Sequence, residues 1–253
     1  MTGNRRALAW NVLGAVAVVA GWWLVARTGA VSQILLPPPD RVAGRLLELL
    51  ARPGFWMDFA STLLLWVLSV GAGVAAGLVV GLLSYLNRAI WYFIQTPVEF
   101  IRSLPSVVLV PIVGLFAGLG GPTQFWSAFA VVAALMIASS ASVVRQLPIG
   151  QERLAHALRL PRRTSLTVFV LPNLLSELMV ALRAAVPLAL VVLIACDMLV
   201  ATETGLGRLI RDGLAILDMR TTFAVVFVVG VLGLLGSLLV SFLDRKLIWW
   251  RSS

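Results

Sequence analysis

The sequence predicts an all-α, polytopic membrane protein with about six transmembrane helices. Hydrophobic residues make up 60% of the 253 residues and charged residues only 12%, whereas a soluble domain usually carries about twice that share of charge. Many apolar runs reach about 18 residues or more, which is enough to cross a bilayer core of roughly 30 Å. Cationic loops that orient membrane helices account for the net charge of +9, so we expect no nucleic-acid partner.

Six segments are expected to cross the lipid bilayer, and they divide the chain into two parts. The segments are residues 8–26, 55–86, 89–119, 124–144, 166–200 and 221–243. Residues 1–53 form an N-terminal transmembrane helix followed by a short periplasmic helix on the membrane surface. Residues 54–253 form a core of five transmembrane helices with a polar loop at 145–165.

The connector after the first span contains three consecutive prolines, Pro37–Pro39, which cannot lie inside a helix. Asp40 is expected to cap a short helix at Arg41–Leu50. The apolar residues of this helix lie mainly on one face, so we expect the helix to lie on the membrane surface. In the second span Gly73, Gly77 and Gly81 recur every four residues. They therefore share one helix face, which favours close contact with another helix.

The third segment contains Pro97, Pro105 and Pro111, a spacing that a straight helix would not tolerate. We expect a helix near the cytoplasmic surface, a break near Pro105, and a spanning helix that ends near Phe116. Glu99 and Arg102 are three residues apart and can pair on one helix face.

The distribution of basic residues predicts the orientation. Of the lysines and arginines in the predicted loops and tails, eleven lie on the side of the two termini and seven on the other side. This bias predicts that both termini are cytoplasmic. The polar stretch Arg145–Pro172, which carries five arginines and the only histidine, is then a cytoplasmic loop.

Several kinds of site are excluded. The single lysine, Lys246, is followed by Leu247 and Ile248, so no phosphate-binding GxxxxGK[ST] loop exists. No cysteine or histidine cluster could hold a metal, and no nucleophile and base pair stands out. We therefore expect no catalytic residue and no cofactor in this chain. If it transports a solute, the energy comes from another polypeptide or from an ion gradient.

Four stretches carry a resemblance to a known family. They are LPPPDRVAGRLLELL (36–50), FIRSLPSVVLVPIVGLFAGLG (100–120), ETGLGRLIRDG (203–213) and LDRKLIWWR (243–251). Together they resemble the inner-membrane permease subunits of ABC importers that work with a binding protein, in particular the sulfonate, taurine and nitrate branch. The resemblance implies a type I importer permease fold, with residues 54–253 as the permease core.

The family's cytoplasmic motif, EAA-x3-G-x9-I-x-LP, aligns without gaps when its end is placed on Leu171-Pro172. Arg153 and Arg159 then stand where the motif has glutamate and glycine. The motif's glycine would favour the end of the helix, and here Pro161 is expected to end it instead. In the family this helix docks into a groove of the ATPase subunit. The resemblance implies that the coupling residues are Glu152, Arg153, Leu154, Ala155, Leu158, Arg159 and Leu160.

Further site residues follow from the same resemblance. In the fifth span the expected translocation-path residues are Glu177, Arg183, Pro187 and Asp197, since ionisable residues within spans usually face protein or water. Arg183 could attract an anion, and Pro187 could break the helix and expose backbone groups. A structural ion pair or a lipid-headgroup contact is the alternative for these residues. Arg208 and Arg211 are expected to contact the binding protein, or else to be simply solvated.

The resemblance implies a permease subunit of an ATP-driven importer in a bacterial inner membrane, with a small anionic organic solute as its cargo. Its partners would be a dimer of ATPase subunits, which bind ATP and Mg, and a periplasmic or lipid-anchored binding protein. The second permease subunit would be an identical copy, although the unusual Arg153 and Arg159 leave a heterodimer open. A secondary transporter or a channel that is not driven by ATP is the alternative, but no inverted internal repeat supports it.

Overall fold

The computed structural model describes residues 2–145, 161–200 and 202–248, and the regular elements within these ranges are all helices. In chain order they are α1 (Thr2–Thr28), α2 (Pro39–Leu50), α3 (Pro53–Leu86), α4 (Arg88–Ser103), η1 (Ser106–Val108), α5 (Leu109–Ala117), α6 (Gly121–Arg145), α8 (Arg162–Ser165), η2 (Leu166–Val170), α9 (Leu171–Leu199), α10 (Leu206–Ala215) and α11 (Met219–Leu247). The predicted all-α class is confirmed.

Within the described residues, four helical stretches are long and apolar enough to cross a membrane, and they correspond to four of the six predicted spans. They are α3, residues 121–143 of α6, η2 with α9, and α11. A fifth span exists if α4 and η1–α5 count as one, although the two parts are bent by 101°. The apolar part of α1, Leu13–Thr28, is shorter than the roughly 18 residues that a helix needs to cross a bilayer. The structure therefore supports a multi-pass membrane protein with four to five spans by length and composition.

The predicted break in the third segment is confirmed, but the helix that follows it is shorter than expected. α4 ends at Ser103, and Leu104 and Pro105 adopt extended or non-helical backbone conformations. α5 has nine residues and rises only about 14 Å. The prediction that this helix crosses the bilayer by itself is wrong, because the hydrocarbon core is roughly 30 Å thick.

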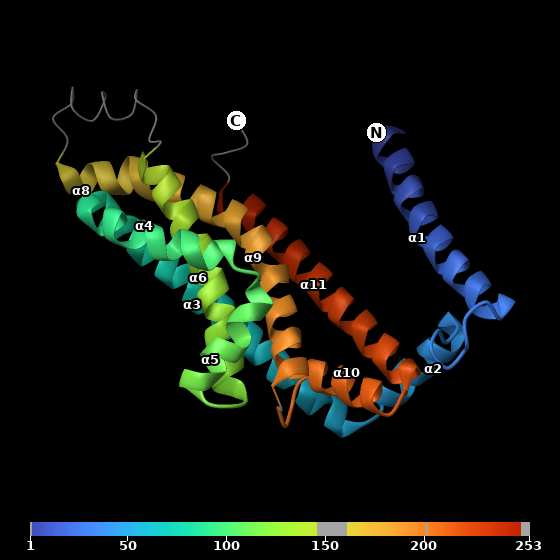
Figure 1. Cartoon of the computed structure of the whole chain (residues 1–253). Coiled ribbons are helices and arrows are strands. Elements are labelled where there is room, and N and C mark those ends of the chain that lie inside the picture. Colours follow the sequence, from blue (N-terminus) through green and yellow to red (C-terminus); the bar gives the residue numbers. More distant parts are fainter. Residues whose placement is uncertain (1, 146–160, 201, 249–253) are drawn as a thin grey trace.

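The helices connect two opposite faces of the molecule (Figure 1). The start of α1, the end of α6, the start of α8 and the end of α11 lie on one side, called the terminal face below. α2, α10 and the turn between α5 and α6 lie on the other side, called the α10 face. Figure 1 also shows that α9 runs through the middle of the bundle, where it packs against α3, α6, α10 and α11.

α2 lies across the α10 face and packs against α11. The helix begins at Pro39 with no side-chain cap, so the prediction that Asp40 is the N-cap is wrong. The guanidinium of Arg45 donates to Thr221 Oγ1 at 2.8 Å and to Asp218 Oδ2 at 3.2 Å. Burial raises the pKa of Asp218, but hydrogen bonds from Thr221 and the charge of Arg45 outweigh it, and the net pKa lies below its ordinary value. Asp218 is thus ionised at neutral pH and ties α2 to the start of α11.

The glycine row of α3 packs against α6, as the four-residue spacing predicts. Gly73, Gly77 and Gly81 lie against Val132, Met136 and Ser140, respectively. A Cβ atom on Gly77 would overlap Met136 Cβ and would lie 2.9 Å from the carbonyl carbon of Met136. Because backbone atoms cannot move aside as a side chain can, the two helices reach this separation only with glycine at these positions.

We expect Gly77→Ala to destabilise the folded protein by about 1–3 kcal/mol, since the added methyl group forces α3 and α6 apart. The matched control is Gly71→Ala, because a Cβ atom on Gly71 would meet nothing within 4 Å. Thermal unfolding of the purified variants in detergent micelles measures the difference. Equal unfolding midpoints for the two variants would contradict the close packing of α3 on α6.

A second close contact joins α3, α9 and α11 around Trp66. The Trp66 side chain is buried, and its indole N–H donates to the Val186 carbonyl at 2.8 Å. Gly236 of α11 leaves room for the ring, since a Cβ atom there would lie 2.8 Å from Trp66 Cζ2. α9 continues without interruption past Pro187, the next residue along, so the prediction that this proline breaks the helix is wrong.

Candidate functional site

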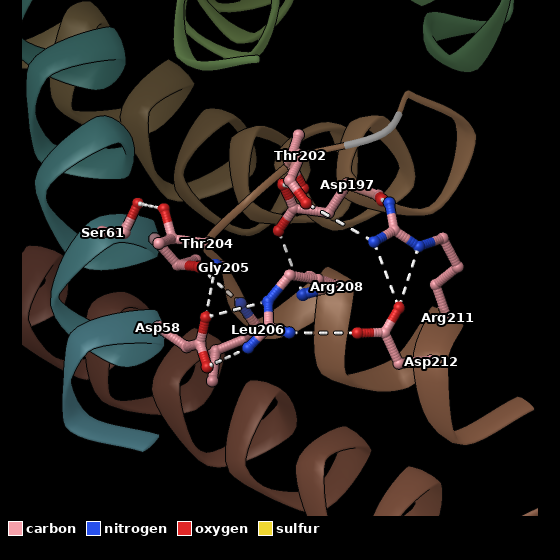
Figure 2. A network of polar contacts seen from close by, with 12 residues as sticks. Asp58, Ser61, Asp197, Thr202, Thr204, Gly205, Leu206, Arg208, Arg211 and Asp212 are labelled. Atoms are coloured by element: carbon pink, nitrogen blue, oxygen red, sulfur yellow. Dashed lines mark hydrogen bonds and ion pairs between the residues drawn. The ribbon is translucent and has the colours of Figure 1, made fainter. Parts of the chain in front are cut away.

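The N-terminus of α10 is held by side chains from two other helices. The first N–H groups of a helix have no partner within the helix. Here three of them have acceptors elsewhere: Gly205 N donates to Asp58 Oδ1 (2.9 Å), Leu206 N to Thr62 Oγ1 (2.9 Å) and Gly207 N to Asp197 Oδ2 (3.0 Å). Asp58 and Thr62 belong to α3 and Asp197 to α9. Figure 2 shows Asp58 and Asp197 near Gly205 and Leu206. Two carboxylates at this helix end also interact favourably with the helix dipole.

The Gly205-Leu206-Gly207 sequence explains why α10 can approach these carboxylates. Gly205 has a φ of 132°, a conformation that residues with a side chain rarely adopt. A Cβ atom on Gly205 would lie 2.9 Å from Asp197 Cγ, and one on Gly207 would lie 2.6 Å from the Ile194 carbonyl oxygen. Both glycines are therefore required by close contact with the end of α9.

Arg208 forms the strongest link between α10 and α3. Its Nε and Nη2 atoms donate to the two carboxylate oxygens of Asp58 at 3.2 and 2.7 Å, and its Nη1 donates to Asp212 at 3.0 Å. The Asp58 side chain is only 4% exposed. A bidentate arginine–carboxylate pair of this kind is both strong and geometrically specific. The hydrogen bond to Asp58 raises the pKa of Arg208 above its ordinary value.

Arg211 and Asp197 connect α10 to the end of α9. Arg211 donates to the carbonyl oxygens of Asp197, Val200 and Thr202 at 3.2–3.4 Å, so a cation satisfies carbonyls at a helix C-terminus. The buried Asp197 side chain also accepts hydrogen bonds from Gln124 of α6 and from Thr202. We call the set Asp58, Thr62, Gln124, Asp197, Thr202, Gly205–Arg208, Arg211 and Asp212 the α10 clamp.

The α10 clamp joins α3, α6, α9 and α10 at the α10 face. Its carboxylates and guanidinium groups are used by one another and by backbone groups, so the α10 clamp is a structural device that holds these helices together. Among the described residues no group of three or more histidine, cysteine, aspartate or glutamate side chains could hold a metal ion.

The structure brings three of the predicted site residues together and separates the others. Asp197, Arg208 and Arg211 all belong to the α10 clamp. Arg183 forms an ion pair with Asp244 near the end of α11. Glu177 is partly buried on α9, and Pro187 lies inside that helix. The coupling residues Glu152–Leu160 lie outside the described residues. Roles of the other residues in the translocation path or in binding-protein contact stay predictions.

Sequence reasoning missed Asp58, Thr62 and Gln124. A signal for one of them was present, because Asp58 is the only charged residue in α3. An ionisable residue at such a position requires a partner inside the protein or water. Arg208 is the partner, but it lies 150 residues further along the chain.

Comparison with known proteins supplies the family. Residues 73–249 match the family described as "Binding-protein-dependent transport system inner membrane component". The chain belongs to this family. It is therefore a permease subunit of an ABC importer, a transport component and not an enzyme, and the α10 clamp lies within the matched residues except for Asp58 and Thr62.

Curated relatives match this permease over most of their length. The taurine transport system permease protein TauC of Escherichia coli is 26% identical over 245 residues, which cover 94% of this chain and 89% of the relative. The putative aliphatic sulfonates transport permease protein SsuC of Bacillus subtilis is 20% identical over 99% of this chain and 91% of its own. The bicarbonate transport system permease protein CmpB of Synechococcus elongatus is 28% identical over 76% of this chain and 68% of its own.

A solved structure shares the fold. The inward-facing MetNI methionine ABC transporter contains a chain that superposes with a TM-score of 0.66 at 18% identity. The match covers 78% of this permease and 98% of that chain. This likeness establishes the ABC importer permease fold.

Proposed function

We propose that this permease forms the translocation path for a small organic anion of the sulfonate, taurine or nitrate type. The observation that carries the proposal is that TauC and SsuC, named for taurine and aliphatic sulfonates, match 94% and 99% of this chain. CmpB, named for bicarbonate, adds a third small anion. Competition by unlabelled sulfonates, nitrate and bicarbonate against uptake of labelled taurine tests the class of solute. Uptake that none of these anions reduces would refute it.

The proposed orientation has the terminal face in the cytoplasm and the α10 face outside. The excess of basic residues at the termini and in the loop at 145–165 supports it. The start of α1, the end of α6, the start of α8 and the end of α11 also lie on the same side of the molecule (Figure 1). In this orientation the 146–160 segment faces the ATPase, and the α10 face receives the binding protein.

In this proposal a separate ATPase dimer binds ATP and Mg and drives transport through Glu152–Leu160. Leu158→Asp is expected to leave the protein folded in the membrane and to abolish transport, because a charge replaces an apolar side chain at the ATPase contact. Uptake of labelled taurine by cells expressing the variant measures the effect, and Leu158→Met is the control of similar volume. Normal uptake by a well-expressed Leu158→Asp protein would refute the coupling role.

The second permease subunit is proposed to be an identical copy, since symmetric pairing is the general default. Co-expression of copies with two different tags tests this. Recovery of both tags in one purified complex supports the homodimer, whereas a complex with one tag and a distinct second permease shows a heterodimer.

A further inference from the structure

The break between α4 and α5 lies part-way between the α10 face and the terminal face (Figure 1). α5 ends at the turn that contains Gly118 and Gly120, both at positive φ, and α6 begins directly after it at the α10 face. From this turn, α5 and the three residues of η1 rise together about 20 Å. The hydrocarbon core is roughly 30 Å thick. With the turn at one membrane surface, Leu104 and Pro105 lie below the opposite surface.

Irregular backbone at this depth cannot face lipid, because lipid offers no hydrogen-bond partners for free backbone groups. It is stable only where protein covers it or where it lines a water-filled cavity. In the single chain the break is uncovered: Ser103 and Pro105 are exposed, and Val107 and Val108 are 39% and 48% exposed.

A charged and polar surface adjoins the break. Arg102 Nη1 donates to both carboxylate oxygens of Glu99 at 2.9 and 3.1 Å, and the side chains are 39% and 61% exposed. Beside the pair is a hollow of about 630 Å³ lined by Trp91, Gln95, Thr96, Glu99, Phe100 and Ser103. Gln95, Glu99 and Ser103 recur every four residues, so they share one face of α4. Exposed charges near a break in a span favour contact with water over lipid.

We propose that this face of α4, together with the break at Leu104-Pro105, lines the water-filled translocation path. Arg102 contacts the transported anion, and Glu99 is its counter-ion when the path is empty. The inference rests on the proposed function and assigns the anion-contacting group within it.

Arg102 fits this role better than the other arginines of the described core. Within the described residues only its Nη1 is engaged, by Glu99, and a guanidinium has further N–H donors for the oxygens of a sulfonate or carboxylate. Arg208 and Arg211 are committed to the α10 clamp, and Arg183 is paired with Asp244 across to α11.

Water access is tested with a membrane-impermeant thiol reagent, 2-sulfonatoethyl methanethiosulfonate. Ser103→Cys is made together with Cys196→Ala, which removes the only native cysteine, and is assembled with its ATPase in membrane vesicles open to the reagent on both sides. We expect Ser103→Cys to react and to lose uptake on reaction. The control is Leu234→Cys, since Leu234 is 58% exposed near the middle of the apolar helix α11, and it is expected to stay unmodified.

Three outcomes would overturn the proposal. An unreactive Ser103→Cys would show that a second subunit or lipid covers this face. If Ser103→Cys does not assemble, Gln95→Cys replaces it, and its lack of reaction would show the same. Equal reaction of the Leu234→Cys control would show that the reagent does not distinguish the path from lipid-facing positions. Reaction without loss of uptake would place the face in water but outside the path. The labelling requires no knowledge of the solute, so it can succeed even if the proposed solute class is wrong.

The anion contact has its own test. Arg102→Gln is expected to raise the KM for taurine uptake at least tenfold with little change in expression, and Arg102→Lys to restore part of the loss because it keeps the positive charge. An unchanged KM in Arg102→Gln would exclude Arg102 as the anion contact.

Discussion

Arg208→Ala is expected to lower the free energy of unfolding by about 3 kcal/mol. The substitution leaves the carboxylate of Asp58, which is 4% exposed, without its charged partner. Removing one member of a buried ion pair strands the other charge away from water, and this usually costs about 3–5 kcal/mol. The lower end applies here because the Arg208 side chain is 27% exposed.

A double-mutant cycle isolates the pair. Asp58→Asn with Arg208→Ala is expected to be less destabilising than the sum of the two single substitutions, because the second change removes the stranded charge. Arg41→Ala on the exposed side of α2 is the control and is expected to change stability by less than about 0.5 kcal/mol. Thermal unfolding in detergent micelles measures the unsubstituted protein and the four variants. Additive effects would show that Arg208 and Asp58 do not interact.

Gly207→Ala is expected to displace the start of α10 and to destabilise the protein by about 2–3 kcal/mol. The new Cβ atom would overlap Asp197 Cβ and lie 2.6 Å from the Ile194 carbonyl oxygen, which belongs to the backbone of α9. Overpacking at a site where neither side can give way typically costs about 1–3 kcal/mol. Displacement would also lengthen the hydrogen bond from Gly207 N to Asp197.

The control for Gly207→Ala is Gly230→Ala in α11, because a Cβ atom on Gly230 would meet nothing within 4 Å. Protection of the α10 amides from hydrogen exchange reports the displacement directly. We expect faster exchange at residues 206–210 in Gly207→Ala and native exchange in Gly230→Ala. Native protection in both variants would show that α10 tolerates a side chain here and that the glycine is not required by packing.

Local patterns in the sequence predicted the elements well, because the signals lie close together along the chain. The four-residue glycine spacing predicted the helix face that packs on α6, and Pro105 predicted the end of α4. The pairing of Glu99 with Arg102 also followed from spacing alone. The depth of the break did not follow, since an apolar run after a proline has the same composition whether it spans half or all of a bilayer.

The candidate site could be predicted only in part, because its contacts join distant segments. The sequence predicts Asp197 as a translocation-path residue and Arg208 and Arg211 as binding-protein contacts, but it does not identify their partners within the chain. In the structure Arg208 pairs with Asp58, 150 residues away, and Arg183 with Asp244, 61 residues away. Such pairs depend on how the helices pack, which spacing within one segment does not determine.

ATP-dependent uptake in proteoliposomes tests the central claim most directly. The permease is purified with its ATPase and reconstituted in proteoliposomes, with the binding protein and labelled taurine on the side of the α10 face and ATP with Mg on the other. We expect labelled taurine to accumulate only when hydrolysable ATP and the binding protein are present, and to do so even when ion gradients are collapsed. Accumulation without ATP, driven by an imposed ion gradient, would contradict it and would identify a secondary transporter.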